Sequence, residues 1–254
     1  MSATHAIADE SDVHLAERLA TEAGAILLDL QANSGLAGKA LGQAGDAQAN
    51  TFLMRMLRTH RPADAILSEE EKDNGDRCSV RRVWIIDPLD GTREYGEGRT
   101  DWAVHVALAI DGVGTIGAVA LPGLGLTLSS GAPMPLAAAG APLRMLVSRT
   151  RPAREAVAVA DALGATLVPM GSAGAKAMAV LRGEADVYLH TGGQYEWDNC
   201  APIAVAQAAG LHVSRADGSP LVYNCADPYL PDLLICRPEL AARVLDLVRQ
   251  LPAA

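Results

Sequence analysis

The 254-residue chain has few aromatic residues, with one Phe, five Tyr and three Trp. Because half of its residues are nevertheless hydrophobic, its core must be built mainly from Ala, Val, Leu and Ile. That hydrophobic content excludes a disordered chain. The length is sufficient for one large domain or two smaller ones.

Basic runs are lacking too. The formal net charge is -9, and Lys and Arg gather in nothing longer than pairs such as Arg81-Arg82. The chain therefore lacks the electrostatic footprint of a protein that binds a nucleic acid polymer. A small anionic substrate is compatible with this composition if cations gather at one site.

Metal-binding Cys and His patterns and long apolar runs are also missing. The four cysteines form no CxxC pair, the six histidines form no pair at ligand spacing, and His105 alternates with apolar neighbours in a predicted strand. No apolar run approaches the roughly 20 residues that span a bilayer. The N-terminal MSATHAIADESD is acidic, unlike a signal peptide. We therefore expect a cytoplasmic protein with reduced thiols and no membrane partner.

The first half predicts two helices over a largely antiparallel sheet. Apolar residues recur at helical spacing in SDVHLAERLATEAGAILLDLQ and in DAQANTFLMRMLRTH, and the glycines between residues 35 and 45 predict a loose connecting segment. Five β-rich runs follow: AILS, RVWIID, WAVHVALAI, GTIGAVALP and LTLSS. Asp111-Gly112 predicts a tight hairpin turn between two of them.

The second half alternates strand and helix patterns, which is typical of an α/β arrangement. It is preceded by GAPMPLAAAGAP, residues 131–142, a stretch without periodicity. We therefore predict an α+β domain at residues 1–135 and an α/β domain at residues 136–254.

Two carboxylates stand where a predicted strand ends, in WIIDPLDGT at residues 84–92. Pro88 fixes the path of the chain between Asp87 and Asp90, so both side chains can converge on one point. Gly91 lets a backbone amide approach a ligand, and Thr92 can begin a helical turn, which together suit a phosphate oxygen. Taken alone, an ordinary turn is the more common explanation of this pattern.

Two further acidic motifs change that balance. ILSEEEKD places Glu69, Glu70 and Glu71 after another short strand, and YEWDNCAPIAVAQAAG places Asp198 at the start of an Ala-rich helix. Separately they are typical of a solvated loop and a helix cap. Two like charges about 4 Å apart repel by about 4 kcal/mol at an effective dielectric near 20, so a buried cluster requires cations. Magnesium, which takes hard oxygen ligands, is the natural candidate.

In this order, the three motifs resemble those of the inositol monophosphatase superfamily of magnesium-dependent, lithium-sensitive phosphomonoesterases. The resemblance spans about residues 46–237 and implies a layered αβαβα sandwich with the active site between its halves. It implies that two or three Mg²⁺ ions are bound and that Gly91 and Thr92 hold the phosphate. Besides ligating metal, Asp90 would act in catalysis and Asp198 would contact the substrate. The implied metal ligands are Glu69, Asp87, the Leu89 carbonyl, Asp90 and Asp198.

One departure from the family pattern concerns the attacking water. Many members carry Asp-x-x-Thr-x-x-Asp before the second helix, and the first Asp pairs with the threonine that corresponds to Thr92. Here residues 40–46 read ALGQAGD, so Ala40 replaces that aspartate and only Asp46 is retained. We therefore expect Thr92 to lack its partner and Glu70 to act as the catalytic base.

Further segments resemble the bacterial CysQ branch of 3'(2'),5'-bisphosphate nucleotidases: SEEEKD, DPLDGTREY, VSRTR, GSAGAKAMAV and YLPDLLICRP. Enzymes of that branch remove the 3'-phosphate of adenosine 3',5'-bisphosphate, a by-product of sulfate activation. The resemblance implies that the 5'-phosphosulfate analogue of this nucleotide is a second candidate substrate. It implies that Ser172, Lys176, Arg149 and Arg151 lie near the nucleotide, although solvated loop and helix positions explain them equally well. An inositol or fructose-bisphosphate phosphatase and a non-catalytic homologue are the alternatives. A homodimer is compatible with the sequence.

Overall fold

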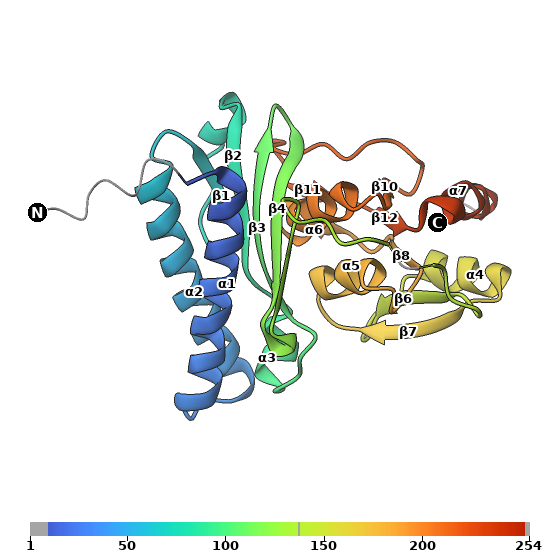
Figure 1. Ribbon diagram of the computed structural model, residues 1–254, viewed down its shortest axis with the longest axis horizontal. Coiled ribbons are helices and arrows are strands. Elements are labelled where there is room, and N and C mark those ends of the chain that lie inside the picture. Colours follow the sequence, from blue (N-terminus) through green and yellow to red (C-terminus); the bar gives the residue numbers. More distant parts are fainter. Residues whose placement is uncertain (1–9, 137, 252–254) are drawn as a thin grey trace, which may run out of the picture.

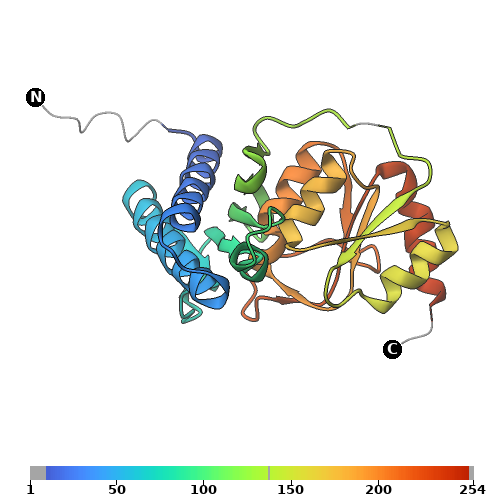
Figure 2. The same cartoon turned by 90° about the horizontal axis from the view of Figure 1, so that it is seen from below.

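The computed structural model describes residues 10–136 and 138–251. Most of the acidic N-terminal segment, from which the absence of a signal peptide was predicted, lies outside the described part. Helices and sheets alternate in five layers across the molecule (Figures 1 and 2). This arrangement confirms the predicted αβαβα sandwich.

The first two layers come from the first half of the chain. Helices α1 (Asp12–Asn33) and α2 (Gly38–His60) cover one face of a five-stranded sheet. The strands are, in spatial order, β1 (Ala65–Ser68), β2 (Arg82–Asp90), β3 (Ala103–Ile110), β4 (Val113–Leu121) and β5 (Leu126–Ser129). Strands β1 and β2 are parallel and the other pairs are antiparallel, so the sheet is largely antiparallel, as predicted. Asp111 and Gly112 form the β3–β4 turn with positive φ.

The remaining layers come from the second half. Helices α5 (Ala173–Leu181) and α6 (Glu196–Ala208) lie between the two sheets, and α4 (Arg154–Leu163) and α7 (Ala241–Gln250) cover the outer face of the second (Figure 2). That sheet contains β10 (His212–Ser214), β12 (Leu233–Cys236), β8 (Val187–His190), β6 (Arg144–Ser148) and β7 (Thr166–Met170). A two-stranded ribbon pairs β9 (Gln194–Tyr195) with β11 (Tyr229–Leu230), and the short α3 (Thr92–Gly96) follows β2.

Strand β2 is buried on both faces, which explains its continuous apolar sequence. Trp84 and Ile86 pack towards α1 and α2, whereas Val83 and Ile85 belong to the central core with α5, α6 and the second sheet. The described residues between β5 and β6 form no helix or strand. Because the central core draws on both halves, the division into two domains at residue 135 stays a prediction.

The prediction of a loose segment from residue 35 to residue 45 is wrong, because α2 already begins at Gly38. Gly42 and Gly45 lie inside this helix, where it crosses α3 closely. A Cβ atom at Gly42 would lie 2.6 Å from Thr92 Cγ2, and one at Gly45 would lie 2.9 Å from Tyr95 Cε1. These glycines therefore serve close helix packing rather than flexibility.

We expect Gly45→Ala to lower the free energy of unfolding by about 1–3 kcal/mol, because the added methyl group overpacks the contact with Tyr95. Alanine's higher helix propensity, worth about 1 kcal/mol, opposes this loss. Urea denaturation of the two proteins measures the difference. The matched control is Ala47→Gly on the exposed face of the same helix, which should cost no more than about 1 kcal/mol. A Gly45→Ala protein as stable as the wild type would contradict the packing argument.

Candidate metal and phosphate site

Three of the predicted carboxylates converge where the first sheet meets α6. Asp87, Asp90 and Asp198 each offer an oxygen within 4.8 Å of the others. In a regular strand, residues three apart point to opposite faces. Here the pairing of β2 with β3 shifts register between Asp87 and Asp90, which pair with His105 and Ala103. This bulge at Pro88-Leu89 aims both aspartates at one point.

Asp90 is the most firmly held member of the cluster. Its buried carboxylate accepts hydrogen bonds from Ser172 Oγ (2.5 Å), Gly174 N (2.6 Å) and Ala173 N (3.1 Å) at the start of α5. Burial raises the pKa of Asp90, but the hydrogen bond and charge of His105, then Ser172, outweigh it and bring the pKa to about 2. Asp90 is therefore an ionised link between β2 and the second half of the chain.

The other carboxylates repel one another. Burial, followed by the charges of Glu69 and Asp90, raises the pKa of Asp87 well above its usual value. Burial and the charge of Asp90 raise the pKa of Asp198 to about 6. Partial desolvation, followed by the charges of Asp198 and Glu70, raises the pKa of Glu69 to about 7. Clustered carboxylates with raised pKa values have too little counter-charge, and hard oxygen donors of this kind fit a divalent cation such as magnesium.

The remaining predicted ligands and phosphate contacts lie around this cluster. Glu69 follows β1 and interacts electrostatically with Asp198 and Asp90, although it is outside the trio within 4.8 Å. The Leu89 carbonyl accepts a hydrogen bond from Thr92 Oγ1 at 3.2 Å. Gly91 has a φ of 91°, and a Cβ atom there would lie 3.2 Å from Ser172 Cβ. The metal and phosphate roles of these residues stay predictions.

The expectation that Thr92 lacks an aspartate partner is wrong. Thr92 Oγ1 lies 3.4 Å from Asp46 Oδ1, so the retained aspartate takes the place expected for residue 40. Asp46 reaches Thr92 because Gly42 and Gly45 let α2 lie against α3. Burial and the nearby charge of Glu70 raise the pKa of Asp46 to about 7. Asp46, Thr92 and Glu70 therefore belong to one group beside the cluster.

His105 is a site residue that the sequence reasoning missed. Its Nδ1 lies 3.0 Å from the Trp197 carbonyl oxygen, which can only accept, so Nδ1 carries a proton and Nε2 faces Asp90 Oδ2 at 3.2 Å. Burial lowers the pKa of His105, but Asp90 outweighs burial and raises it. The available signal was a lone polar residue on an apolar strand face, opposite Asp87 in the antiparallel pair.

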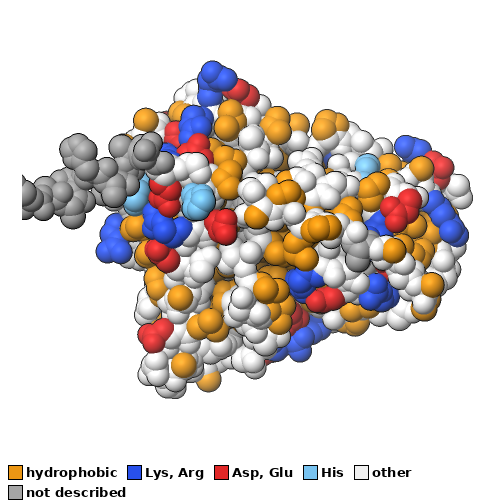
Figure 3. Space-filling view, in the orientation of Figure 1, with side chains coloured by type: hydrophobic (Ala, Val, Ile, Leu, Met, Phe, Trp, Pro, Cys, Tyr) orange, Lys and Arg blue, Asp and Glu red, His pale blue; other side chains and the backbone are white. Residues whose placement is uncertain are grey.

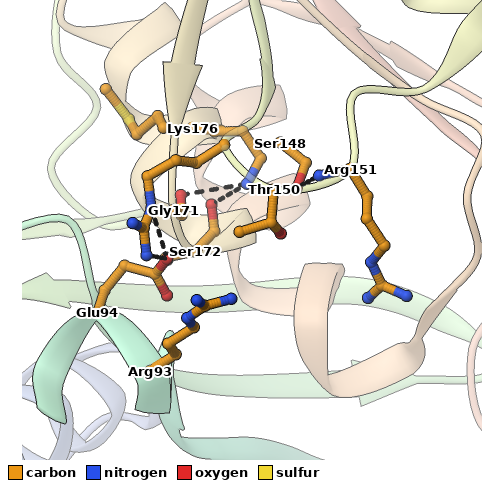
Figure 4. A pocket seen from close by; sticks show the side chains of 10 residues that line it. Arg93, Glu94, Ser148, Thr150, Arg151, Gly171, Ser172 and Lys176 are labelled. Carbon is orange, nitrogen blue, oxygen red and sulfur yellow. Dashed lines mark hydrogen bonds and ion pairs between the residues drawn. The ribbon is translucent and has the colours of Figure 1, made fainter. Parts of the chain in front are cut away.

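A cavity of about 530 Å³ opens beside the cluster and contains all four predicted nucleotide contacts (Figure 4). Ser172 belongs to both places, because it lines the cavity and donates its hydroxyl proton to Asp90. Four cationic side chains and one carboxylate line the cavity. Its lining is Arg93, Glu94, Ser148, Arg149, Thr150, Arg151, Met170, Gly171, Ser172 and Lys176.

The cationic residues of this cavity differ in how they are held. Lys176 is buried, so the solvated-helix explanation is wrong for it, and its Nζ donates to the carbonyls of Gly171 and Ser172. Burial lowers the pKa of Lys176, although Asp90 and Glu94 oppose the shift. Arg149 is ion-paired with Glu94 and with Glu97. Arg151 extends along the far side of the cavity from Glu94 (Figure 4).

The visible surface agrees with the absence of a polybasic sequence. On the face shown in Figure 3, acidic and basic side chains lie next to one another, without an extended basic area. Within residues 10–136 and 138–251, every helix is too short or too polar to cross a membrane.

Comparison with known proteins agrees with this fold and site. Residues 9–252 match the inositol monophosphatase family, and the chain belongs to that family. It is 48% identical to the 3'-phosphoadenosine 5'-phosphate phosphatase of Mycobacterium leprae (strain TN), over 96% of this chain and 95% of that protein. It is 51% identical to the protein of the same name from Mycobacterium tuberculosis (strain CDC 1551 / Oshkosh), over 89% of each. The crystal structure of CysQ from Bacteroides thetaiotaomicron aligns with a TM-score of 0.78 at 25% identity, covering 90% of this chain and 98% of that one. The family resemblance seen in the sequence is confirmed.

The raised pKa values predict an unusual pH dependence for protein without metal. A carboxyl group whose pKa is higher in the folded state than in the unfolded chain stabilises the fold below its unfolded pKa, and this stabilisation is lost as pH rises through the folded pKa. Glu69, Asp46 and Asp198 have folded pKa values of about 7, 7 and 6, against ordinary values of 4.5, 3.8 and 3.8. We therefore expect the urea midpoint in EDTA to fall between pH 4 and pH 7.

Magnesium should reverse that loss, because a bound cation favours the ionised carboxylates. The urea midpoint at pH 7 should rise on addition of Mg²⁺, and much less so in Asp87→Asn, which lacks one clustered charge. A metal-free midpoint that is flat or rising from pH 4 to pH 7 is the result that this electrostatic account does not allow.

Proposed function

We propose that this protein is a magnesium-dependent phosphatase that removes the 3'-phosphate of adenosine 3',5'-bisphosphate, giving AMP and phosphate. The observation that carries the proposal is the shared Ser172, which joins the carboxylate cluster to a cavity lined by four cations. The cluster suits the reacting phosphate, and the cavity suits a second anionic group of the same substrate. Relatives with about half of their residues identical are named for this activity.

The metal ligands in this proposal are Glu69, Asp87, the Leu89 carbonyl, Asp90 and Asp198, holding two or three Mg²⁺ ions. When bound, the metal ions would promote deprotonation of a water molecule and neutralise the oxygen that leaves. The chain's part is to hold the carboxylates in place. Asp90 is positioned by α5 and His105, and Asp198 Oδ2 is positioned by a 2.6 Å hydrogen bond from Tyr195 N.

The proton of the attacking water goes to the group formed by Thr92, Asp46 and Glu70. Thr92 Oγ1 lies within hydrogen-bond distance of Asp46 Oδ1, so Thr92 can take up the water proton on its oxygen while it passes its own hydroxyl proton to the Asp46 carboxylate. Asp46, with a pKa of about 7, is suited to proton transfer near neutral pH. We therefore place the Thr92–Asp46 pair ahead of Glu70 as the base.

Substrate recognition falls to the residues around Ser172. The backbone amides of Gly91 and Thr92 would hold the 3'-phosphate, and Lys176, Arg149 and Arg151 would face the second phosphate. The 5'-phosphosulfate analogue offers a related anionic group to the same cavity. The proposal also includes a role in sulfate assimilation, a cytoplasmic location, inhibition by lithium and a homodimer. The lithium effect is carried over from the resemblance of the acidic motifs to the superfamily.

A substrate panel tests the proposed specificity. With Mg²⁺ present, kcat/KM for phosphate release should be highest for adenosine 3',5'-bisphosphate, because it alone of the panel places a nucleotide 5'-phosphate in the cavity beside Ser172. Inositol 1-phosphate and fructose 1,6-bisphosphate are the competing substrates. Turnover of either one at an equal or better kcat/KM would refute the nucleotide assignment, and no release from any of them would favour a non-catalytic homologue. The same panel in EDTA should show no release.

Two substitutions distinguish the candidate bases. We expect Asp46→Asn to lower kcat by about 100-fold or more with little change in KM, because Thr92 loses its charged partner. The exposed Asp29→Asn on α1 is the matched control. Steady-state kinetics with circular dichroism as a fold check makes the comparison. If Glu70→Gln abolishes turnover while Asp46→Asn keeps it, Glu70 is the base instead.

A further inference from the structure

Two of the four cations that line the cavity share one acidic partner, Glu97. Its Oε1 lies 3.0 Å from Arg93 Nε, and its Oε2 lies 2.9 Å from Arg149 Nη2. Glu97 itself lies just past the end of α3, outside the lining of the cavity. One carboxylate beside the cavity therefore forms ion pairs with both arginines.

The second acidic partner of Arg149 is held differently. Glu94 is buried, and its Oε1 accepts hydrogen bonds from Arg149 Nη2 at 2.8 Å and from Arg149 Nε at 3.2 Å. Gly171 packs so closely that a Cβ atom there would lie 2.3 Å from Glu94 Cγ. Figure 4 shows Glu94 and Arg93 rising from α3 towards Gly171 and Ser172. Glu94 is thus a fixed anchor for the Arg149 side chain.

Glu97, by contrast, can be displaced. Its side chain is 38% exposed, and its partner Arg93 is 66% exposed, so both ion pairs lie in contact with solvent. Ion pairs of this kind contribute little to stability, and water can replace either partner. A phosphate dianion carries more charge than a carboxylate and can bind an arginine with two parallel hydrogen bonds. A phosphate group in the cavity therefore competes well for the same guanidinium groups.

We propose that Glu97 is a displaceable counter-ion for Arg93 and Arg149, which the second phosphate of a bisphosphorylated substrate replaces. Glu97 keeps the two arginines in place while the cavity is free of substrate. A singly charged or neutral group interacts too weakly with the arginines to displace the Glu97 carboxylate. Glu97 thus determines specificity for a doubly charged second phosphate, and it acts through Arg93 and Arg149. This inference rests on the proposed function, because it assigns the cavity to the second phosphate.

Removing the competitor should strengthen binding of the second phosphate. We expect Glu97→Gln to lower KM for adenosine 3',5'-bisphosphate about two- to five-fold, the range expected when weak, solvent-exposed ion pairs are lost. KM for 3'-AMP, which has no 5'-phosphate, should not move. The matched control is Glu184→Gln, which removes the same charge from a 53% exposed glutamate paired with Arg182 outside this cavity.

A binding measurement separates this inference from the proposed reaction. Calorimetric titration with AMP, whose 5'-phosphate fits the same place, needs no turnover and should show a two- to five-fold lower Kd in Glu97→Gln. A wild-type protein that binds AMP but hydrolyses no bisphosphate would overturn the proposed reaction alone. An unchanged or higher Kd for AMP in Glu97→Gln, or an equal gain for 3'-AMP, would overturn the counter-ion role.

Discussion

The site depends on one buried carboxylate, that of Asp90, held at the first turn of α5. Three hydrogen bonds from residues 172–174 and the contact with His105 keep it ionised inside the core. Because Asp90 lies on β2 and its three hydrogen-bond donors lie in the second half, these bonds tie the two halves of the sandwich together at the site. The carboxylate cluster exists only where that alignment brings α6 and Asp198 to the end of β2.

The same alignment divides the charges into two unlike places. On one side of Ser172, carboxylates with raised pKa values lack counter-charge, and on the other side four cations line a cavity. The protein does not cancel these charges against each other. Ser172 and the backbone of the loop before α5 lie between them, and Lys176 is bound to backbone carbonyls rather than to the carboxylates. Excess charge of both signs is thus available for metal ions and for an anion.

The sequence allowed the longer strands, the helices that cover them and the acidic motifs to be predicted, because each leaves a local pattern, whereas the αβαβα layering was implied by the family resemblance. The short strands β9, β10 and β11 were not predicted. Asp87 and Asp90 stand at a Pro-containing strand end, and β2 alternates its apolar residues between two cores. Features that depend on pairing between distant segments were missed. His105 matters only because β3 lies antiparallel to β2, and Asp46 reaches Thr92 only because glycines bring α2 against α3. The sequence around Gly42 and Gly45 was interpreted as a loop, because the close contact of α2 with α3 that requires these glycines cannot be seen in the sequence.

The ion pairs of Arg149 illustrate why a list of plausible contacts does not define a binding site. From sequence, Arg149 was either a solvated residue of a basic loop or a residue near the nucleotide. In the folded chain it already has two carboxylate partners, one buried and one at the surface. A ligand must therefore exchange with a resident charge rather than fill an empty position, and affinity reflects the difference between two sets of interactions. Selectivity for a dianion follows from that difference, since a weaker anion gains too little to displace Glu97.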